Sequence, residues 1–217
     1  MKNEIIKYIK RNRVSTTEIA DCLGKTGALE GVLPINPGCF CVGNVKWVYA
    51  YKSTNWDVHK NIVDTQEGDI VFIDAVECES RSVIGELVSK YILLYLQASA
   101  IVTNASMRDA AALIREKYPI WCKGVSPIGC FNTKPETDPS QEWLQEHKEK
   151  YDGAIMVCDD CGVVLIPKEF HTKEFLDKIV AIEQQEDIWF DRLDRKKEST
   201  FDIVCLKNYL RDNDEDN

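Results

Sequence analysis

The adjacent residues Arg108 and Asp109 combine two side chains that suit a small carboxylate ligand held beside a metal ion. The planar guanidinium of Arg108 presents a fork of N–H donors that can bind a carboxylate through two hydrogen bonds. Asp109 is a hard oxygen ligand of the kind that Mg²⁺ or Mn²⁺ prefers. The same dipeptide is also common as an exposed pair in the first turn of a helix, and this alternative stays open.

A second stretch that could bind an anion is Gly85–Glu86–Leu87, which opens a predicted apolar helix at Val88–Leu96. The first backbone N–H groups of a helix have no acceptor within the helix and attract negative charge. Glycine lets a ligand approach the backbone closely. Arg108–Asp109 begins another predicted helix, which follows a predicted strand at Ala100–Thr103 and the turn residues Asn104–Ser106. The sequence therefore predicts that two helix N-termini and the Arg–Asp pair converge on one small site.

The Cys158–Cys161 spacing is the one cysteine pattern that could indicate a zinc or redox site. Zinc needs a second pair of ligands, and the sequence offers no matching cysteine or histidine pair. A redox motif of this spacing begins a helix, whereas this one joins two predicted strands, Ala154–Val157 and Val163–Ile166. We expect a hairpin turn that holds neither zinc nor a functional disulfide.

The three histidines give a weaker signal. His59, His147 and His171 are far apart in the sequence and lie among polar residues, so surface or capping roles are expected for them. Glu186, in the last long helix, is read from the sequence as part of a solvated face. The sequence contains neither a glycine-rich phosphate loop nor a Gly-x-Ser-x-Gly elbow.

Periodicity and capping signals place these residues on a chain of alternating helices and strands. Ser15–Glu18 has the pattern of a capping box, and Ile70–Asp74 is a continuous apolar run typical of a central strand. Helix Val88–Leu96 is too short to cross a membrane and is expected to be buried. The remaining expected elements are helices at Asn3–Asn12, Thr16–Leu23, Trp56–Val63, Gln141–Lys150 and Glu174–Arg195, and strands at Cys39–Tyr51, with a break near Gly43, and Ile120–Cys122.

The composition of the 217 residues is that of a globular protein, with 44% hydrophobic and 29% charged residues. No linker is evident, so one domain is expected over residues 1–217, with a frayed acidic tail at 211–217. The net charge of −9 argues against nucleic acid as a direct partner. The sequence shows neither a signal peptide nor a membrane span, and the nine cysteines are scattered, so we expect a cytoplasmic protein with reduced thiols and no membrane partner.

Several short motifs, in this order, resemble the RraA family, which comprises regulators of ribonuclease E activity and the 4-hydroxy-4-methyl-2-oxoglutarate aldolases. Each motif alone is weak, but their shared order over roughly residues 14 to 190 is fairly specific. The motifs are Thr17–Gly24, Glu67–Asp74, Gly85–Leu87, Arg108–Asp109, Tyr118–Trp121 and Cys158–Pro167.

The resemblance implies a single-domain α/β fold of the β/β/α swivelling, phosphohistidine-domain-like type, assembled as a homotrimer or a dimer of trimers. In aldolase members, the amides of the turn matching Gly85, Glu86 and Leu87, together with the arginine matching Arg108, hold a small 2-oxo acid substrate. The aspartate matching Asp109 anchors Mg²⁺ (or Mn²⁺). An acid on the C-terminal helix of a neighbouring subunit completes the site in some members, and Glu186 is the candidate here.

The activity implied by the resemblance is a metal-dependent aldol cleavage that releases pyruvate, with decarboxylation of oxaloacetate as a related reaction. The sequence departs from the aldolase pattern at Arg81 and Ala112, where the family usually carries acids. The alternative is a non-catalytic regulator that binds a partner protein such as a ribonuclease. A phosphohistidine carrier lacks support, because no histidine lies in a Gly/Thr-rich loop.

Overall fold

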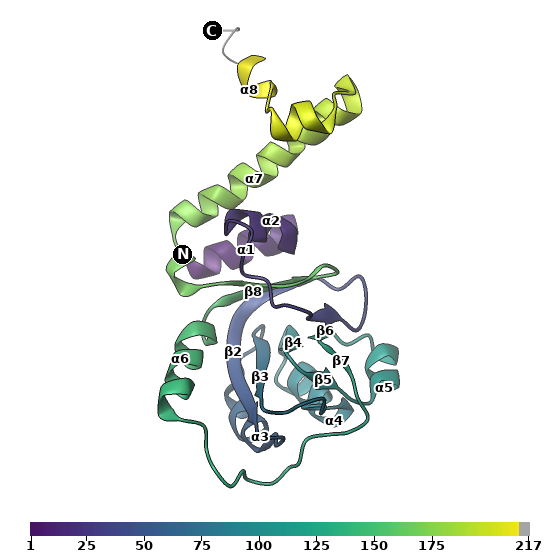
Figure 1. The fold of residues 1–217 in the computed structure, drawn as a ribbon, viewed down its shortest axis with the longest axis vertical. Helices are drawn as coiled ribbons and strands as arrows, with labels where there is room; N and C mark the ends of the chain where they lie inside the picture. The colour runs from purple at the N-terminus through teal and green to yellow at the C-terminus, as the bar shows by residue number, and fades with distance from the viewer. Residues whose placement is uncertain (213–217) are drawn as a thin grey trace.

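The computed structural model describes residues 1–212, which form a rounded body and a helical arm. The arm is the long helix α7 (Lys173–Asp191), which leaves the body beside α1 and α2 and projects away from it (Figure 1). Every residue named so far as a candidate for the anion site lies in the body, whereas Glu186 lies on the arm.

One mixed sheet organises the body, with strands in the order β1-β6-β4-β3-β2-β8-β9. The four strands β2, β3, β4 and β6 run parallel to one another, and the outer strands are antiparallel to their neighbours. A separate pair, β5 and β7, lies beside this sheet. The strands are β1 (Leu33–Pro34), β2 (Cys41–Tyr51), β3 (Ile70–Val76), β4 (Ala100–Thr103), β5 (Ser106–Met107), β6 (Ile120–Cys122), β7 (Gly124–Val125), β8 (Ile155–Asp159) and β9 (Gly162–Ile166).

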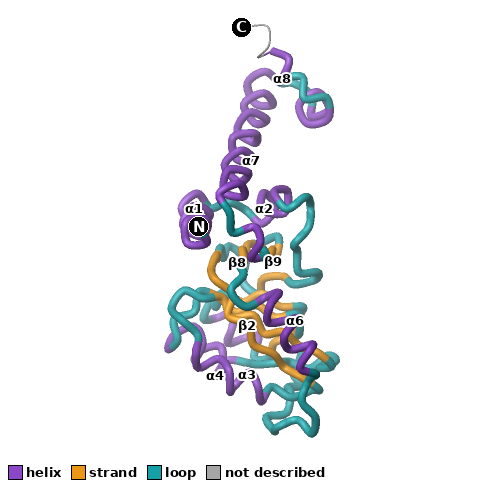
Figure 2. Tube along the Cα trace, turned by 90° about the vertical axis from the view of Figure 1, so that its left-hand side faces the viewer, coloured by secondary structure: helices purple, strands orange, loops and turns teal. Residues whose placement is uncertain are grey.

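Helices cover the sheet in three groups, each with its own apolar core (Figures 1 and 2). Short helices α3, α4 and α5 pack on one face, α6 packs on the other, and α1, α2 and α7 pack against the β8–β9 hairpin. The helices are α1 (Lys2–Asn12), α2 (Thr16–Cys22), α3 (Trp56–Asn61), α4 (Glu86–Lys90), α5 (Ala110–Arg115), α6 (Gln141–Tyr151), α7 and α8 (Tyr209–Asp212), with helical turns at η1 (Ile62–Asp64), η2 (Tyr91–Tyr95), η3 (Lys168–Phe170), η4 (Arg192–Lys196) and η5 (Phe201–Cys205).

Two elements form where short sequence signals predict them. The predicted capping box is present at α2, where Ser15 Oγ accepts from the Glu18 amide and Glu18 Oε2 accepts from the Ser15 amide. The predicted central strand is also present, since β3 lies between β2 and β4 and is buried along most of its length. Both signals are local in the sequence, which is why periodicity and spacing sufficed to find them.

The predicted break in the strand near Gly43 is wrong, because β2 is continuous from Cys41 to Tyr51. Gly43 lies in the part of β2 that pairs with β8, two residues before Val45, where pairing with β3 begins. A side chain at Gly43 would lie 2.6 Å from the carbonyl oxygen of Gly68, so glycine is needed here for close approach of two backbones.

The helix predicted at Val88–Leu96 begins two residues earlier, at Glu86, and is more exposed than expected. It is divided into α4 and the π-helical turn η2, and only Ser89, Ile92 and Leu93 of these two elements are buried. Its other face presents Leu94 and Tyr95 to solvent. A helix made of an apolar run can therefore be buried on one face and exposed on the other. Hydrophobicity alone does not show which of its apolar residues will be exposed.

The predicted tail at 211–217 lies mostly outside the described residues, and 211–212 are seen only as the end of α8. Within residues 1–212, no helix is both long enough and apolar enough to span a bilayer.

Candidate functional site

The candidate site lies where two loops leave the parallel part of the sheet and enter short helices. The first loop runs from the end of β3 to α4 and carries Gly85, which is the N-cap of α4. The second runs from β4 through β5 to α5 and carries Arg108 and Asp109. Carboxyl ends of parallel strands are the usual place for ligand-binding loops, because neighbouring loops converge there.

The Arg108 side chain lies across two glycines. Its amide donates to the Ile84 carbonyl (3.1 Å), which fixes the backbone beside the start of α4. An added Cβ at Gly85 would lie 2.7 Å from Arg108 Cγ, and one at Gly129 would lie 2.7 Å from Arg108 Nη1. Both positions must therefore lack a side chain for the arginine to occupy this place. The Arg108 side chain remains about half exposed, so a ligand can still reach it.

Asp109 caps the neighbouring helix rather than its own. Its backbone has a left-handed conformation (φ 59°), and its Oδ2 accepts the backbone N–H of Glu86 at 3.0 Å. The same oxygen lies 3.7 Å from Arg108 Nε. Of the three amides that the resemblance assigns to substrate binding, that of Glu86 is thus engaged by Asp109 in this structure. The Leu87 amide has no hydrogen-bond acceptor within residues 1–212 and stays available.

These groups open onto a small cavity of about 90 Å³. Its wall includes Asn55, which is buried and donates through Nδ2 to the Val83 carbonyl (2.8 Å). The Oδ1 atom of Asn55 is buried without a hydrogen-bond partner in the described structure. Because a buried acceptor without a donor is costly, this atom indicates a place for a hydroxyl, an amide or water.

His59 also lines this cavity and is exposed at its edge, so the predicted surface position is confirmed. It lies on α3, a helix whose position beside the Gly85 loop comes from packing between distant segments. Partial burial lowers the pKa of the His59 imidazole from its ordinary value, which favours the neutral form. A sequence signal for this role is absent, because Asn55 and His59 are about 50 residues from Arg108.

The cavity offers a divalent ion few protein ligands. Asp109 is the one carboxylate in the cavity wall, and no group of three or more acids, histidines or cysteines within residues 1–212 could enclose a metal. Mg²⁺ commonly uses one or two protein carboxylates and completes its shell with water and substrate oxygens. The site therefore fits a water-rich Mg²⁺ or Mn²⁺ ion on Asp109, and does not fit an enclosed metal such as structural zinc.

The two positions that depart from the aldolase pattern have structural roles of their own. Arg81 donates to the Gly129 carbonyl (3.0 Å) and lies over the Phe131 ring at 4.7 Å. It thereby holds the glycine on which Arg108 rests. Ala112 is buried in the first turns of α5. Neither position supplies an acid within one chain.

The structure places Glu186 away from this site. It lies on α7 near Glu18 and Asp21 of α2, and burial, followed by these charges, raises the pKa of its carboxyl. Whether Glu186 of a neighbouring subunit completes the site stays a prediction.

The expectation for His147 is wrong. Its Nδ1 lies 2.6 Å from Oδ2 of the buried Asp74, and its ring packs on Trp143 at 4.1 Å between centroids. His147 therefore holds α6 on the sheet, on the face opposite the candidate site. Cys158 is buried in β8 whereas Cys161 is exposed in the turn, so the two thiols lie in different surroundings.

Comparisons with known proteins match most of the chain to one family. A family model described as RraA-like, Aldolase/RraA, matches residues 16–165. A protein of Halalkalibacterium halodurans named "Putative 4-hydroxy-4-methyl-2-oxoglutarate aldolase" is 28% identical over 184 residues, which cover 77% of this chain and 80% of that protein.

Two solved structures have the same fold. An uncharacterized protein from Pseudomonas syringae pv. tomato superposes with a TM-score of 0.70 at 20% identity, covering 92% of this chain and 96% of that chain. Streptomyces coelicolor RraAS2, described as an unusual member of the RNase ES inhibitor RraA protein family, gives a TM-score of 0.68 at 21% identity, covering 85% and 94%. These likenesses confirm the predicted fold class.

Proposed function

Because this chain belongs to the RraA-like family, we propose that it is a divalent-metal-dependent lyase that cleaves a small 2-oxo acid and releases pyruvate. The observation that carries the proposal is the placement of Arg108 across Gly85 and Gly129, directly beside Asp109. This arrangement joins a carboxylate-binding fork to a metal-binding carboxylate in one small cavity. The substrate class is that of 4-hydroxy-4-methyl-2-oxoglutarate.

Binding of such a substrate uses the donors that the site leaves open. Arg108 binds the carboxylate and keto oxygen of the 2-oxo acid, and the Leu87 amide donates to the same carboxylate. Asn55 Oδ1, which lacks a partner, accepts a hydrogen bond from the substrate hydroxyl. A substrate without this hydroxyl leaves the buried oxygen unpaired, which favours hydroxylated 2-oxo acids.

In the cleavage step, the neutral imidazole of His59 accepts the proton of the C4 hydroxyl. The C3–C4 bond breaks, C4 becomes a carbonyl carbon, and the electron pair forms the enolate of pyruvate. Arg108 stabilises the negative charge on the enolate oxygen. A Mg²⁺ or Mn²⁺ ion held by Asp109 would supply further stabilisation of that charge. His59 returns its proton to C3 and completes pyruvate. Decarboxylation of oxaloacetate passes through the same enolate.

The experiment that tests the proposal is a panel of 2-oxo acids with Mg²⁺ or Mn²⁺, coupled to detection of pyruvate. Arg108→Lys keeps the charge but loses the planar fork, so turnover should fall by about 10²–10³-fold. Asp109→Asn should mainly weaken metal binding, so excess Mg²⁺ should restore part of its activity and none of that of Arg108→Lys. Absence of pyruvate from every substrate with wild-type protein would remove the enzyme proposal.

A second candidate is a non-catalytic regulator that binds a partner protein such as a ribonuclease. It is favoured by Arg81 and Ala112, which leave Asp109 as the one acid in the cavity. It is also favoured by the likeness to RraAS2, which is described as belonging to an inhibitor family. Divalent-metal binding measured by calorimetry separates the two functions, because the lyase requires it and the regulator does not.

A further inference from the structure

Two buried thiols meet beside the candidate site. Cys78 lies in the loop that leaves β3, and Cys130 follows Gly129 in the loop that leaves β7. A hydrogen bond joins the two thiol side chains, and neither cysteine forms a disulfide in the described structure. The two residues are far apart in the sequence, so it is the fold that brings them together.

Backbone hydrogen bonds to Ser53 hold the two cysteine segments in place. The Ser53 amide donates to the carbonyl of Glu77, which precedes Cys78 (3.1 Å). The amide of Phe131, which follows Cys130, donates to the Ser53 carbonyl (2.8 Å). Both segments are therefore bonded to the same residue, which fixes the position of one thiol relative to the other.

Arg81 connects the two cysteine loops with the Arg108 cavity. Its amide donates to the Cys78 carbonyl (3.0 Å), which closes a turn, and its Nη1 donates to the Gly129 carbonyl (3.0 Å). Gly129 lies against the Arg108 guanidinium, where an added Cβ would be 2.7 Å from Nη1. Because Gly129 directly precedes Cys130, a movement of Cys130 is transmitted to the support of Arg108.

The two thiols differ in acidity. The hydrogen bond from the Cys130 thiol lowers the pKa of Cys78, whereas the same hydrogen bond, followed by burial, raises the pKa of Cys130. Burial is the main cause that raises the pKa of Cys122, another buried thiol. The pair therefore favours one thiolate, at Cys78, and the thiolate is the reactive form of cysteine.

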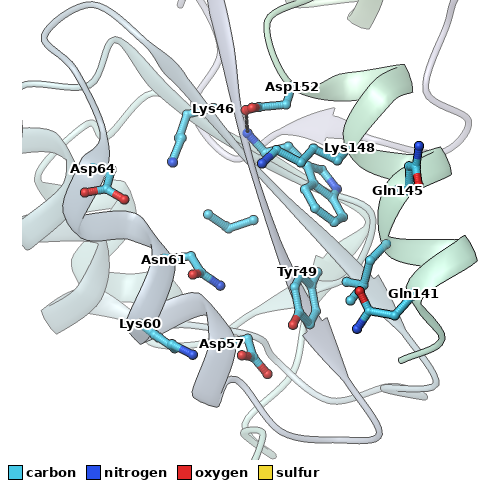
Figure 3. Close-up of a pocket in the computed structure, with 13 residues that line it drawn as sticks. Lys46, Tyr49, Asp57, Lys60, Asn61, Asp64, Gln141, Gln145, Lys148 and Asp152 are labelled. Atoms are coloured by element: carbon cyan, nitrogen blue, oxygen red, sulfur yellow. Dashed lines mark hydrogen bonds between the residues drawn. The ribbon is translucent and has the colours of Figure 1, made fainter. Parts of the chain in front are cut away.

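A small reagent can reach the pair from the Arg108 cavity. Cys130 forms part of the wall of this cavity of about 90 Å³, and Cys78 adjoins the wall through its hydrogen bond to Cys130. The larger groove between the α3–η1 segment and α6, shown in Figure 3, carries lysines and aspartates in equal number, and none of the described residues that line it is a cysteine. The Arg108 cavity admits a molecule as small as hydrogen peroxide, since one water occupies about 30 Å³ of liquid.

We propose that Cys78 and Cys130 form a modification site at which hydrogen peroxide oxidises the two thiols to a disulfide, and that this disulfide displaces Arg108. Formation of the disulfide does not depend on the lyase function. Its effect on turnover rests on that proposed function.

The oxidation takes two steps and needs one molecule of peroxide. The Cys130 sulfur attacks a peroxide oxygen while its proton passes to the Cys78 thiolate, the O–O bond breaks, and hydroxide leaves and is protonated to water. The Cys78 sulfur then attacks the sulfenic sulfur of Cys130. The S–O bond breaks, and the hydroxyl group leaves as water with the Cys78 proton. Both sulfurs are oxidised, and both peroxide oxygens are reduced to water.

The disulfide would change the position of Gly129. A covalent bond between the sulfurs is shorter than any contact between two thiols, so the Cys130 backbone has to move toward Cys78. Gly129 moves with it, and the Arg108 guanidinium loses the surface against which it lies.

Buried cysteines also serve as small apolar core residues, and both residues belong to the core beneath α3, α4 and α5. An inert core pair reacts with peroxide only after the protein unfolds. A modification site reacts in the folded protein, and its two sulfurs select each other as partners.

The test is peroxide treatment of the folded wild-type protein, followed by alkylation of the remaining thiols in denaturant and tryptic mapping without reduction. Cys78 and Cys130 fall in different tryptic peptides, 61–81 and 124–148, and neither peptide has another cysteine. These peptides should appear as one linked species that has lost two hydrogen atoms, and dithiothreitol should separate them. Treatment in urea should abolish this preference for one pair.

Matched variants separate this pair from other buried thiols. Cys130→Ser should remove the link, whereas Cys122→Ser, which changes another buried thiol, should leave it unchanged. Thermal melts verify that both variants are folded. The mapping of the wild-type protein needs no variant.

Two measurements report on the cavity without reference to catalysis. The Cys130 amide, which donates to the Ser82 carbonyl (2.9 Å), should exchange its hydrogen at least about tenfold faster after oxidation. The Nε–H resonance of Arg108 in NMR spectra should also shift. Where pyruvate release is measured, peroxide should lower wild-type turnover by about tenfold or more, and dithiothreitol should restore it.

The outcomes distinguish this proposal from that of the lyase. Absence of the linked peptides from the folded protein would overturn the modification site, whether or not pyruvate is released. Loss of the link in Cys122→Ser would also overturn it, since the pairing would not be specific. An unchanged Arg108 resonance in the linked protein would show that the disulfide does not displace Arg108. Linked peptides with a shifted resonance, in a protein that releases no pyruvate, would support the modification site and remove the lyase function alone.

Discussion

At the scale of single residues, two glycines decide where Arg108 lies. Neither Gly85 nor Gly129 has a positive φ, so the backbone conformation does not require glycine there. Glycine is needed because a side chain at either position would overlap that of Arg108. The guanidinium fills that space and faces the cavity, while Asp109 is fixed by the Glu86 amide. The sequence predicted the Arg–Asp pair and Gly85 because they adjoin in recognisable turns. It did not reveal Gly129, whose role comes from a loop about 20 residues away.

Gly85→Ala should therefore abolish most activity without unfolding the protein. The added methyl group would overlap Asp109 Oδ2 and press on the Arg108 side chain, so the pair would have to move. Displacement of one preorganised donor typically lowers turnover by about 10²–10³-fold. Pyruvate release and a thermal melt measure the two effects. Gly124→Ala is the matched control, because an added Cβ there has no neighbour within 4 Å. Unchanged turnover in Gly85→Ala would mean that Arg108 does not act from this position.

His59 gives a prediction about pH. If it accepts the hydroxyl proton, the rate requires its neutral form and falls as the pH drops through its pKa. Burial lowers this pKa, so the acid limb of kcat should have its midpoint below 6.5. His59→Gln should lower kcat about 10²-fold or more and remove that limb, with little change in KM. His171→Gln serves as a control, since burial lowers that pKa as well but the residue is outside the cavity. Persistence of the limb in His59→Gln would assign it to another group.

At the scale of elements, short-range signals predicted most boundaries, and long-range partners account for the errors. The capping box, the β8–β9 hairpin and the helix starts at α4 and α5 depend on neighbours in sequence. The continuity of β2 through Gly43 depends on Gly68, and the packing of α6 depends on Asp74. Such contacts leave no periodic pattern. For the same reason, the sequence could not indicate Asn55 and His59 as parts of the site.

His147→Ala should loosen α6 from the sheet. The substitution removes one of three donors to the buried carboxylate of Asp74, leaving Trp47 Nε1 (3.2 Å) and Asn104 Nδ2 (3.0 Å). A buried acceptor that loses a partner costs about 1–3 kcal/mol of unfolding free energy. Urea denaturation measures this loss. Glu146→Ala, exposed on the same helix, should change stability by less than about 0.5 kcal/mol. Equal stability of the two variants would show that water replaces the imidazole without cost.

At the scale of the whole molecule, the exposed apolar surface is unevenly distributed. Leu87, Leu94 and Tyr95 are 82%, 55% and 71% exposed, and all belong to the α4–η2 segment that begins at the candidate site. Contiguous apolar side chains of this size are unfavourable in water and commonly mark a protein interface. An interface on this face would cover the open side of the Arg108 cavity, where a residue of a neighbouring subunit such as Glu186 could reach the ligand.

We therefore expect the protein to assemble as a homotrimer or a dimer of trimers through the α4–η2 face. Light scattering should give three or six times the 24.8 kDa of one chain. Leu94→Glu should shift the mass to that of a single chain. Association would then bury an unpaired charge in an apolar contact, and removing that charge from water is energetically costly. Val63→Glu, a similarly exposed position on η1, should leave the assembly intact.

The two variants and the wild-type protein distinguish the remaining possibilities. A wild-type protein that is monomeric at micromolar concentration would reject the assembly. An assembled Leu94→Glu protein would place the interface elsewhere, for instance on the arm. If Leu94→Glu is monomeric, folded and inactive, and Glu186→Gln is assembled and inactive, then the acid acts across subunits. If the monomer retains full turnover, one chain contains the complete site and Glu186 has no part in it.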